Sequence, residues 1–225
     1  MSLTKVTGSL LILLPIAFNV IFFLLQRTFE YPDILRKPTD HILSQFNARG
    51  KWLVILWYSF AVAALLFAPV AILVHQVLAS DDLPYMALAT TIGVLAGLVQ
   101  FLGLIRWSFL VPYLARTYFE PKASQATRDS IAIVFQAFHR YAGMAIGEHL
   151  GYLCTSVWTA FIALALTQSP SFSPWLGRVG LVPAIGIFIG LFEESGFKAA
   201  GAINAVSYVL WSIWLIVLGA AFLLH

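Results

Sequence analysis

Long apolar stretches alternate with short polar ones along the chain, and this alternation predicts transmembrane helices. The hydrocarbon core of a bilayer is about 30 Å thick, so a helix needs about 20 apolar residues to cross it. Six stretches are long enough or nearly so, and they occupy residues 6–25, 52–78, 86–115, 143–166, 176–192 and 203–224. The fifth is the shortest. We therefore expect an all-α fold, a polytopic transmembrane bundle of six helices that forms one domain over residues 1–225.

The first stretch also has to be compared with a cleaved signal peptide. Its apolar run exceeds the usual h-region of about 7–15 residues, and only Lys5 precedes it. It ends in Gln26-Arg27 without small residues at the spacing of a cleavage site. These features favour a helix that is retained in the mature protein.

Lysine and arginine residues concentrate in alternate loops, which predicts the orientation of the bundle. The loops after the first, third and fifth helices hold Arg27, Arg36, Lys37, Arg49, Lys51, Arg116, Lys122, Arg128 and Lys198. The opposite side holds Lys5, Arg178 and the acidic pair Asp81-Asp82. Because positively charged loops stay in the cytoplasm, we expect both termini outside and the two long loops inside.

The two long loops carry signals for further helical segments. In the first loop, Thr39 or Asp40 can cap a short helix. That helix would carry the apolar residues Ile42, Leu43 and Phe46. In the second loop, apolar residues recur at helical spacing at Ile131, Val134, Phe135 and Phe138. A helix over residues 130–166 would be roughly 55 Å long, so its first turns are expected to lie in the cytoplasmic interface as an amphipathic piece.

The two long loops also resemble each other. A shift of 89 residues aligns residues 27–46 with residues 116–135, and identical residues fall at six positions. The identities are Arg27/Arg116, Thr28/Thr117, Pro32/Pro121, Asp40/Asp129, Ile42/Ile131 and Phe46/Phe135. They suggest a parallel duplication of a two-helix unit. Chance, together with similar interfacial chemistry, is the alternative explanation.

Composition supports the membrane assignment and excludes other classes. Of the 225 residues, 60% are hydrophobic and 10% charged, and the mean hydropathy is +0.88. Soluble domains average about 45–50% apolar and 25% charged residues. The net charge of +3 is scattered, so no nucleic-acid partner is expected, and the bilayer is the main partner. The single cysteine, Cys154, excludes a disulfide framework within the chain and is expected to be a small buried hydrophobe.

Glycines at four-residue spacing predict close approach between helices. They lie at Gly143, Gly147 and Gly151, at Gly93 and Gly97, and at Gly186 and Gly190. We expect these faces to pack within the bundle. The alternative is that they dock a second copy of the chain or another membrane protein.

Polar and ionisable residues within apolar segments are the candidates for function, because such residues are costly in a bilayer. We select seven as ligand or polar-cavity candidates: Arg106, His139, Arg140, Glu148, His149, Glu193 and Asn204. In the expected orientation most of them fall in the cytoplasmic half of the bundle. We therefore predict a polar cavity that faces the cytoplasm, with Arg106 paired to Glu148 because each charge needs a partner.

Structural roles compete with this interpretation. Arg106 and Glu148 can pair only to hold the bundle together, and His139 and Arg140 can face phospholipid headgroups. Glu193, with its neighbours Glu194 and Lys198, can be a solvated loop charge.

Spacing identifies no metal site and no catalytic residue, and the cofactor stays unassigned. A b-type haem needs two facing histidines, and the candidates His75 and His149 differ in predicted depth. Cys154 follows His149 by five residues, so the two do not share a helix face cleanly for nucleophilic catalysis. A phosphate-binding glycine loop is absent from the sequence.

Three segments resemble a bacterial family of small six-span proteins, domain-of-unknown-function family 4386. They are Tyr31-Pro32-Asp33-Ile34-Leu35-Arg36, then Arg106-Trp107 followed by Leu110-Val111-Pro112, and residues 135–158 with Gly147-Glu148-His149-Leu150-Gly151 at their centre. The resemblance covers nearly the whole chain. It implies a multi-pass protein of the bacterial cytoplasmic membrane, and it supplies no activity or catalytic residue.

Three functional classes follow from these observations. The first is a protein that binds or transports a small polar or amphiphilic ligand through the predicted cavity. The second is a membrane-embedded enzyme that depends on a metal or haem. The third is an accessory subunit of a larger membrane complex. We expect the first, because charged residues inside membranes often line substrate or ion paths.

Overall fold

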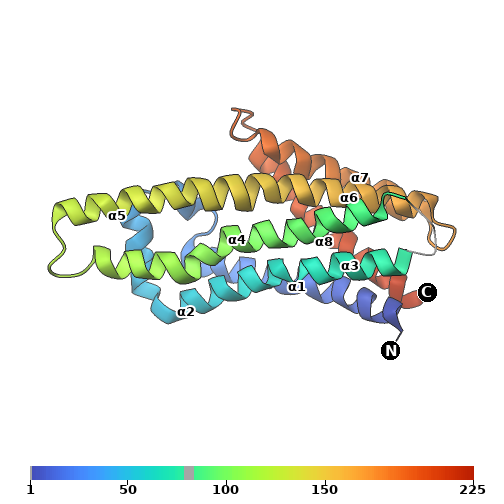
Figure 1. The fold of residues 1–225 in the computed structure, drawn as a ribbon, viewed down its shortest axis with the longest axis horizontal. Helices are drawn as coiled ribbons and strands as arrows, with labels where there is room; N and C mark the ends of the chain where they lie inside the picture. The colour runs from blue at the N-terminus through green and yellow to red at the C-terminus, as the bar shows by residue number, and fades with distance from the viewer. Residues whose placement is uncertain (1, 79–83) are drawn as a thin grey trace. The chain divides into compact units, whose positions relative to one another are not determined.

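The computed structural model describes residues 2–78 and 84–225, and within them the chain is almost entirely helical (Figure 1). In chain order the helical elements are α1 (Leu3–Phe29), η1 (Asp33–Arg36), α2 (Thr39–Leu65), α3 (Phe67–Leu78), α4 (Met86–Tyr118), α5 (Gln125–Phe138), η3 (His139–Leu150), α6 (Gly151–Gln168), α7 (Pro174–Ile189), η4 (Gly190–Phe192) and α8 (Ala200–Leu224). The acidic pair Asp81-Asp82 lies outside the described residues.

Six helices of the described chain are long and apolar enough to cross a membrane, which confirms the predicted fold class. They are Leu3–Phe29, Thr39–Leu78, Met86–Tyr118, Gln125–Gln168, Pro174–Phe192 and Ala200–Leu224. Each contains or closely matches one of the six predicted stretches. The direction in which the helices cross the membrane stays a prediction.

The second spanning helix begins earlier than the apolar pattern indicated. Helix α2 starts at Thr39, so it includes the residues of the short helix that was expected in the first long loop. Ile42, Leu43 and Phe46, which the short helix was expected to carry, are buried. Gly50 interrupts the helix with φ 57° and ψ −138°, a conformation that L-residues with a side chain rarely adopt. The break separates the loop-derived first turns from the apolar part of the helix.

The fourth spanning helix runs without interruption from α5 through η3 to α6, as Figure 1 shows. Ser124 caps its start by accepting a hydrogen bond from the backbone N–H of Thr127 at 3.1 Å. Its middle portion, η3, is a π-helix of 12 residues. The apolar pattern predicted a helix here but not its π-helical hydrogen bonding.

The chain divides into two compact units. Unit 1 contains Met1–Ala17, Leu65–Val99 and His149–His225, and unit 2 contains Phe18–Ala64 and Gln100–Glu148. Neither unit is one continuous segment. The single domain predicted over residues 1–225 stays a prediction.

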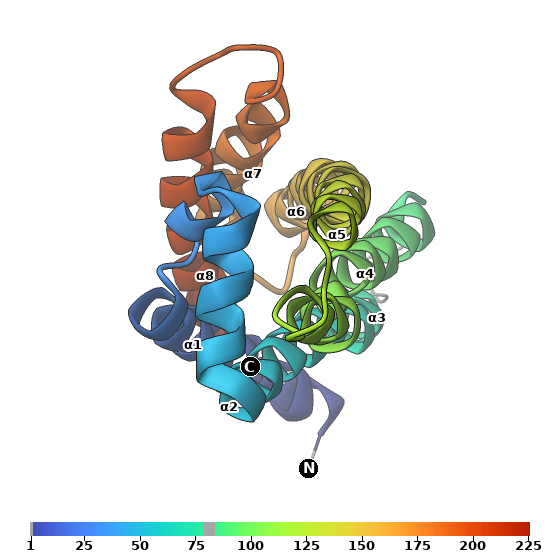
Figure 2. The same ribbon diagram turned by 90° about the vertical axis from the view of Figure 1, so that its left-hand side faces the viewer.

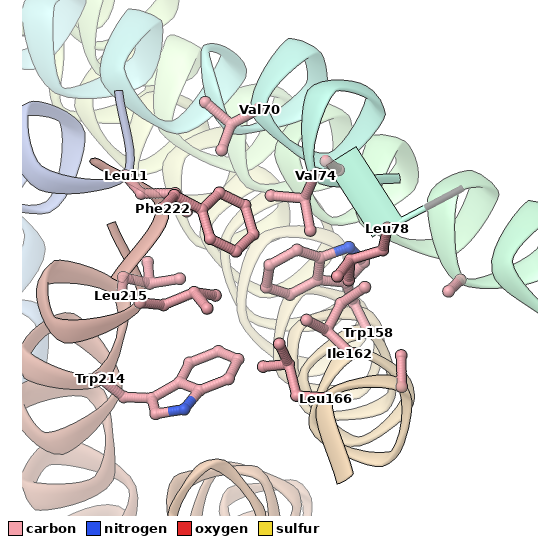
Figure 3. Close-up of a cluster of buried hydrophobic side chains, with 14 of the residues drawn as sticks. Leu11, Val70, Val74, Leu78, Trp158, Ile162, Leu166, Trp214, Leu215 and Phe222 are labelled. Atoms are coloured by element: carbon pink, nitrogen blue, oxygen red, sulfur yellow. The ribbon is translucent and has the colours of Figure 1, made fainter. Parts of the chain in front are cut away.

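Unit 1 has a core of large apolar side chains, part of which Figure 3 shows. Trp158 is fully buried there, and its indole fits against Gly93, where an added Cβ would have no room. Helices α7 and α8 form a hairpin (Figure 2). The backbones of α1 and α8 touch at Gly8 and Gly219, because a Cβ on either would lie within 2.7 Å of the other's carbonyl oxygen. Small residues at contact points are the usual means by which membrane helices approach closely.

Helix α7 also packs closely on α6, and this contact supports a stability prediction. A Cβ atom at Gly177 would collide with the carbonyl oxygen of Ala163, a backbone atom that cannot turn aside. We expect Gly177→Ala to destabilise the protein by about 1–3 kcal/mol, the usual effect of overpacking. Reversible unfolding in mixed micelles would measure it. Val182→Ala, at a side chain of α7 that is 59% exposed, is a surface control on the same helix and should have little effect. Equal effects of the two substitutions would contradict this account.

Unit 2 is built around stacked aromatic rings. The indoles of Trp57 and Trp107 stack at 4.7 Å with an interplanar angle of 11°. Phe46 stacks on Trp107 with a centroid distance of 6.1 Å, and Phe135 meets the same indole edge-on at 6.1 Å. Phe46 and Phe135 are a matched pair of the 89-residue repeat, and both are buried. The other apolar pair, Ile42 and Ile131, is buried as well. Common burial is compatible with a duplicated two-helix unit, and the duplication stays a prediction beside its alternative, chance together with similar interfacial chemistry.

Candidate functional site

The seven candidate residues fall into two groups, one in each unit. Unit 2 holds Arg106, His139, Arg140 and Glu148, and unit 1 holds His149, Glu193 and Asn204. Each group is therefore a separate candidate site.

The group in unit 2 is organised around the guanidinium of Arg106 on α4. Its Nη1 donates to the carbonyl oxygen of Gly103, one turn earlier on the same helix. Its Nη2 donates to Nδ1 of His139 over a long distance of 3.5 Å. The guanidinium lies against Gly143, where an added Cβ would be 2.5 Å from Nη2. Gly143 therefore leaves the space into which the arginine side chain extends.

Arg106 also interacts electrostatically with Glu148 and Tyr31. Tyr31, Arg106, His139 and Glu148 are called the Arg106 cluster below. The cluster contains one permanent cation and one carboxyl group, and the two interact electrostatically. The expected proximity of Arg106 and Glu148 agrees with this arrangement. Their role as a site stays a prediction.

Tyr31 was not among the candidates, because it lies in a loop rather than in an apolar segment. It precedes a cis peptide bond to Pro32, and its ring packs edge-on against Trp57 at 5.0 Å. The pKa of its hydroxyl is raised above the ordinary value, first by burial and then by the carboxylate of Glu148, whereas Arg106 acts in the opposite direction. Tyr31 therefore stays a neutral phenol at physiological pH. The sequence signal that could have found it is the Tyr31-to-Arg36 segment that carried the family resemblance.

The packing of η3 on α4 fixes the position of the cluster. Gly147 of η3 faces Gly103 of α4 so closely that a Cβ at Gly103 would lie 2.5 Å from the Cα of Gly147. The ring of His139, at the start of η3, is parallel to that of Phe135 at 6.0 Å. Two backbones in contact and one stacked ring hold the imidazole next to Arg106. The glycine run predicted a close contact here, and the contact lies within the chain.

The other two candidate residues of η3 lie at the surface. Arg140 and His149 are both exposed, although Arg140 still acts on His139 electrostatically. Neither packs into the Arg106 cluster, so the structure does not join them to the predicted cavity. The cavity itself stays a prediction.

The group in unit 1 lies at the turn between α7 and α8. Asn204 is buried, and its Nδ2 donates to the carbonyl oxygen of Ile187 at 3.3 Å. The carboxylate of half-buried Glu193 lies against Gly201, where an added Cβ would be 2.9 Å from Oε1. The Asn204 contact joins α7 to α8, a structural role that polar side chains often have between membrane helices.

Within residues 2–78 and 84–225, no group of three or more His, Cys, Asp and Glu side chains could hold a metal ion. Of the two histidines considered for haem, His75 pairs through Nδ1 with Oγ1 of Thr90 at 2.8 Å, and His149 is exposed. Cys154 is half-buried and packs against the core of unit 1.

An open depression of about 450 Å³ lies elsewhere on unit 2. It is lined by Asn47, Arg116, Thr117, Phe119, Glu120 and Pro121. None of the seven candidate residues lines it. Arg116 is therefore a useful control for Arg106, because it is an exposed arginine on the same helix.

The fold defines a class, that of α-helical multi-pass membrane proteins with six spans. Within that class, the chain belongs to the family described as Domain of unknown function (DUF4386), which matches residues 6–219. The match confirms the family that the three sequence segments indicated. No functionally curated protein and no solved structure matches the chain significantly.

Proposed function

We propose that the protein binds a small polar or amphiphilic ligand at the Arg106 cluster, which the ligand reaches from the cytoplasmic side. The observation that carries the proposal is the placement of the Arg106 guanidinium between α4 and η3, against Gly143 and next to His139. Ionisable residues within spanning helices are rare and usually mark ligand, ion or proton paths.

Helix length supports access from one face of the membrane. Helix α4 has 33 residues, which correspond to roughly 50 Å at 1.5 Å per residue. Arg106 lies 20 positions after Met86, about 30 Å along the helix, a distance equal to the thickness of the hydrocarbon core. With the predicted orientation, Met86 is near the outer surface. Arg106 then reaches the cytoplasmic interface, where polar ligands and lipid headgroups are both available.

The chemistry of the cluster suits a ligand with one polar end. Arginine presents five N–H donors in a planar fork, and the two contacts to Gly103 and His139 use only part of them. The guanidinium also lies over the face of the Trp107 indole, 5.2 Å from the ring centroid, so an aromatic ring adjoins the polar groups. Polar groups next to apolar side chains are typical of ligand sites.

Native mass spectrometry of the protein in mild detergent tests the proposal with a matched pair of variants. Arg106→Lys keeps the charge but removes the planar fork, so we expect about tenfold less co-purified ligand, equivalent to about 1.4 kcal/mol. Arg116→Lys makes the same chemical change at an exposed position of the same helix and should retain the ligand. Equal ligand content in the wild type and Arg106→Lys would refute the proposal, as would a wild-type protein that carries no small molecule.

A further inference from the structure

The π-helix η3 is unusual in length and contains the residues that surround Arg106. It extends over His139–Leu150, 12 residues, whereas π-helical hydrogen bonding mostly occurs as single turns that often mark functional sites. Both His139 and Glu148 of the Arg106 cluster belong to it. Its hydrogen bonds therefore decide which side chains face the guanidinium.

The separation of His139 and Glu148 shows how strongly the helix type matters. Nine residues make two and a half turns of an α-helix, which would place the two side chains on opposite faces. In a π-helix, with bonds from residue i to i+5, nine residues make about two turns and place both on the same face. Only the π-helical form brings the histidine and the carboxylate to Arg106 together.

Burial along η3 follows the wider π-helical period. The buried residues are His139 and Gly143, and the partly buried residues are Ala142, Met144, Ile146, Gly147 and Glu148. The exposed residues are Arg140, Tyr141, Ala145, His149 and Leu150, which recur every four to five positions. An α-helical period would have exposed Glu148 and turned Leu150 inward.

The composition of the segment allows a change of helical form. Gly143 and Gly147 lie inside η3, and glycine permits the backbone changes that a shift of hydrogen-bond partners requires.

We propose that η3 is a two-state switch in which an anionic ligand group, a phosphate or a carboxylate, replaces Glu148 at Arg106 while the segment converts from π-helical to α-helical hydrogen bonding. This inference rests on the proposed function and names its ligand class. Without ligand, Glu148 neutralises Arg106. With ligand, the anion forms charge-assisted hydrogen bonds to the guanidinium, and Glu148 turns by about half a turn relative to His139. Arg106 keeps an anionic partner in both states, as a partly buried charge requires.

Cysteine labelling measures the register of η3 independently of ligand affinity. In a Cys154→Ser background, Leu150→Cys places a thiol at a site that is exposed in the π-helical form and faces inward in the α-helical form. Ala145→Cys places a thiol that is exposed in both forms and serves as the control. The maleimide labelling rate of each would be followed in detergent with and without inorganic phosphate. Mixed micelles that contain phosphatidylglycerol or phosphatidylcholine would extend the comparison to lipid headgroups.

Whichever anionic additive binds should slow the labelling of the cysteine at position 150 on the order of tenfold, because a thiol must be exposed to react. Labelling at position 145 should not change. Glu148→Gln, which removes the competing carboxylate, should tighten binding of the same additive on the order of tenfold. A response to free phosphate identifies a soluble anion, and a response to phosphatidylglycerol alone identifies a lipid headgroup.

The two proposals fail in different ways. An additive that binds through Arg106 while labelling at position 150 stays constant would overturn the switch and leave the proposed function intact. Stronger slowing by phosphatidylcholine than by either anion would overturn the ligand class. If wild-type protein and Arg106→Lys bind every additive equally, the proposed function itself is wrong, and the switch has no ligand to respond to.

Discussion

Arg106→Gln is expected to destabilise the protein by about 3 kcal/mol, because removing one partner of a partly buried charge pair leaves the other charge uncompensated. We place the effect at the lower end of the usual range because the Arg106 side chain is partly exposed. Glu148 interacts electrostatically with Arg106, so it is the charge that would be left without compensation. Reversible unfolding in mixed micelles would measure the loss.

The double variant Arg106→Gln/Glu148→Gln provides the internal control. Removing both charges should recover much of the stability, with a coupling energy of at least about 1 kcal/mol in the double-mutant cycle. Strict additivity of the two substitutions would show that the pair contributes nothing to folding. The contribution of Arg106 would then come only from its N–H hydrogen-bond donors.

Trp57→Ala is expected to cost about 3–5 kcal/mol, the range for removing a large aromatic side chain from a packed core. The indole is fully buried, stacks on Trp107, and meets Phe29 edge-on at 6.1 Å. Without it, a cavity opens in the aromatic centre of unit 2, and the rings around it lose their contacts. The same unfolding measurement applies.

Trp52→Ala makes the identical chemical change five residues earlier in the same helix. The side chain of Trp52 is 54% exposed, which agrees with a role in the membrane interface, so we expect a change of less than about 0.5 kcal/mol. A similar loss at positions 52 and 57 would contradict the assignment of Trp57 to a packed core.

The apolar pattern was sufficient to predict the spanning helices because length and hydropathy decide whether a segment can cross a bilayer. It could not predict where the helices end. Helix α2 begins at Thr39, because Ile42, Leu43 and Phe46 are buried within unit 2 rather than held at a lipid interface. Tertiary burial of that kind depends on residues far away in the sequence, and a local pattern does not contain it.

The candidate site was predicted in part for a related reason. Selecting charges within apolar segments found Arg106, His139 and Glu148, three members of the cluster. The same rule also selected His149 and Arg140, which are exposed, and Glu193 and Asn204, which belong to the other unit. An α-helical projection would have separated His139 from Glu148, since nothing in the sequence signals a π-helix. Tyr31 was missed because a loop residue reaches the cluster only through the fold.

The glycine spacing predicted that other parts of the chain approach these glycines closely, but it did not predict which groups do so. Gly147 meets another helix backbone at Gly103, as four-residue spacing predicts. Gly143 instead makes room for an arginine side chain, and Gly190 makes room for Asn204. A missing Cβ leaves a space, and the sequence does not say whether a backbone or a polar side chain fills it.

The length of η3 has a consequence for comparing this chain with its relatives. Twelve residues form about 2.7 turns of a π-helix, and an α-helix makes the same number of turns with about ten. A relative that keeps an α-helix here, with the same helix faces on either side, would therefore align with a gap of about two residues between His139 and Leu150. Such a deletion is the mark by which an evolutionary survey could separate relatives that have the π-helical segment from those that lack it.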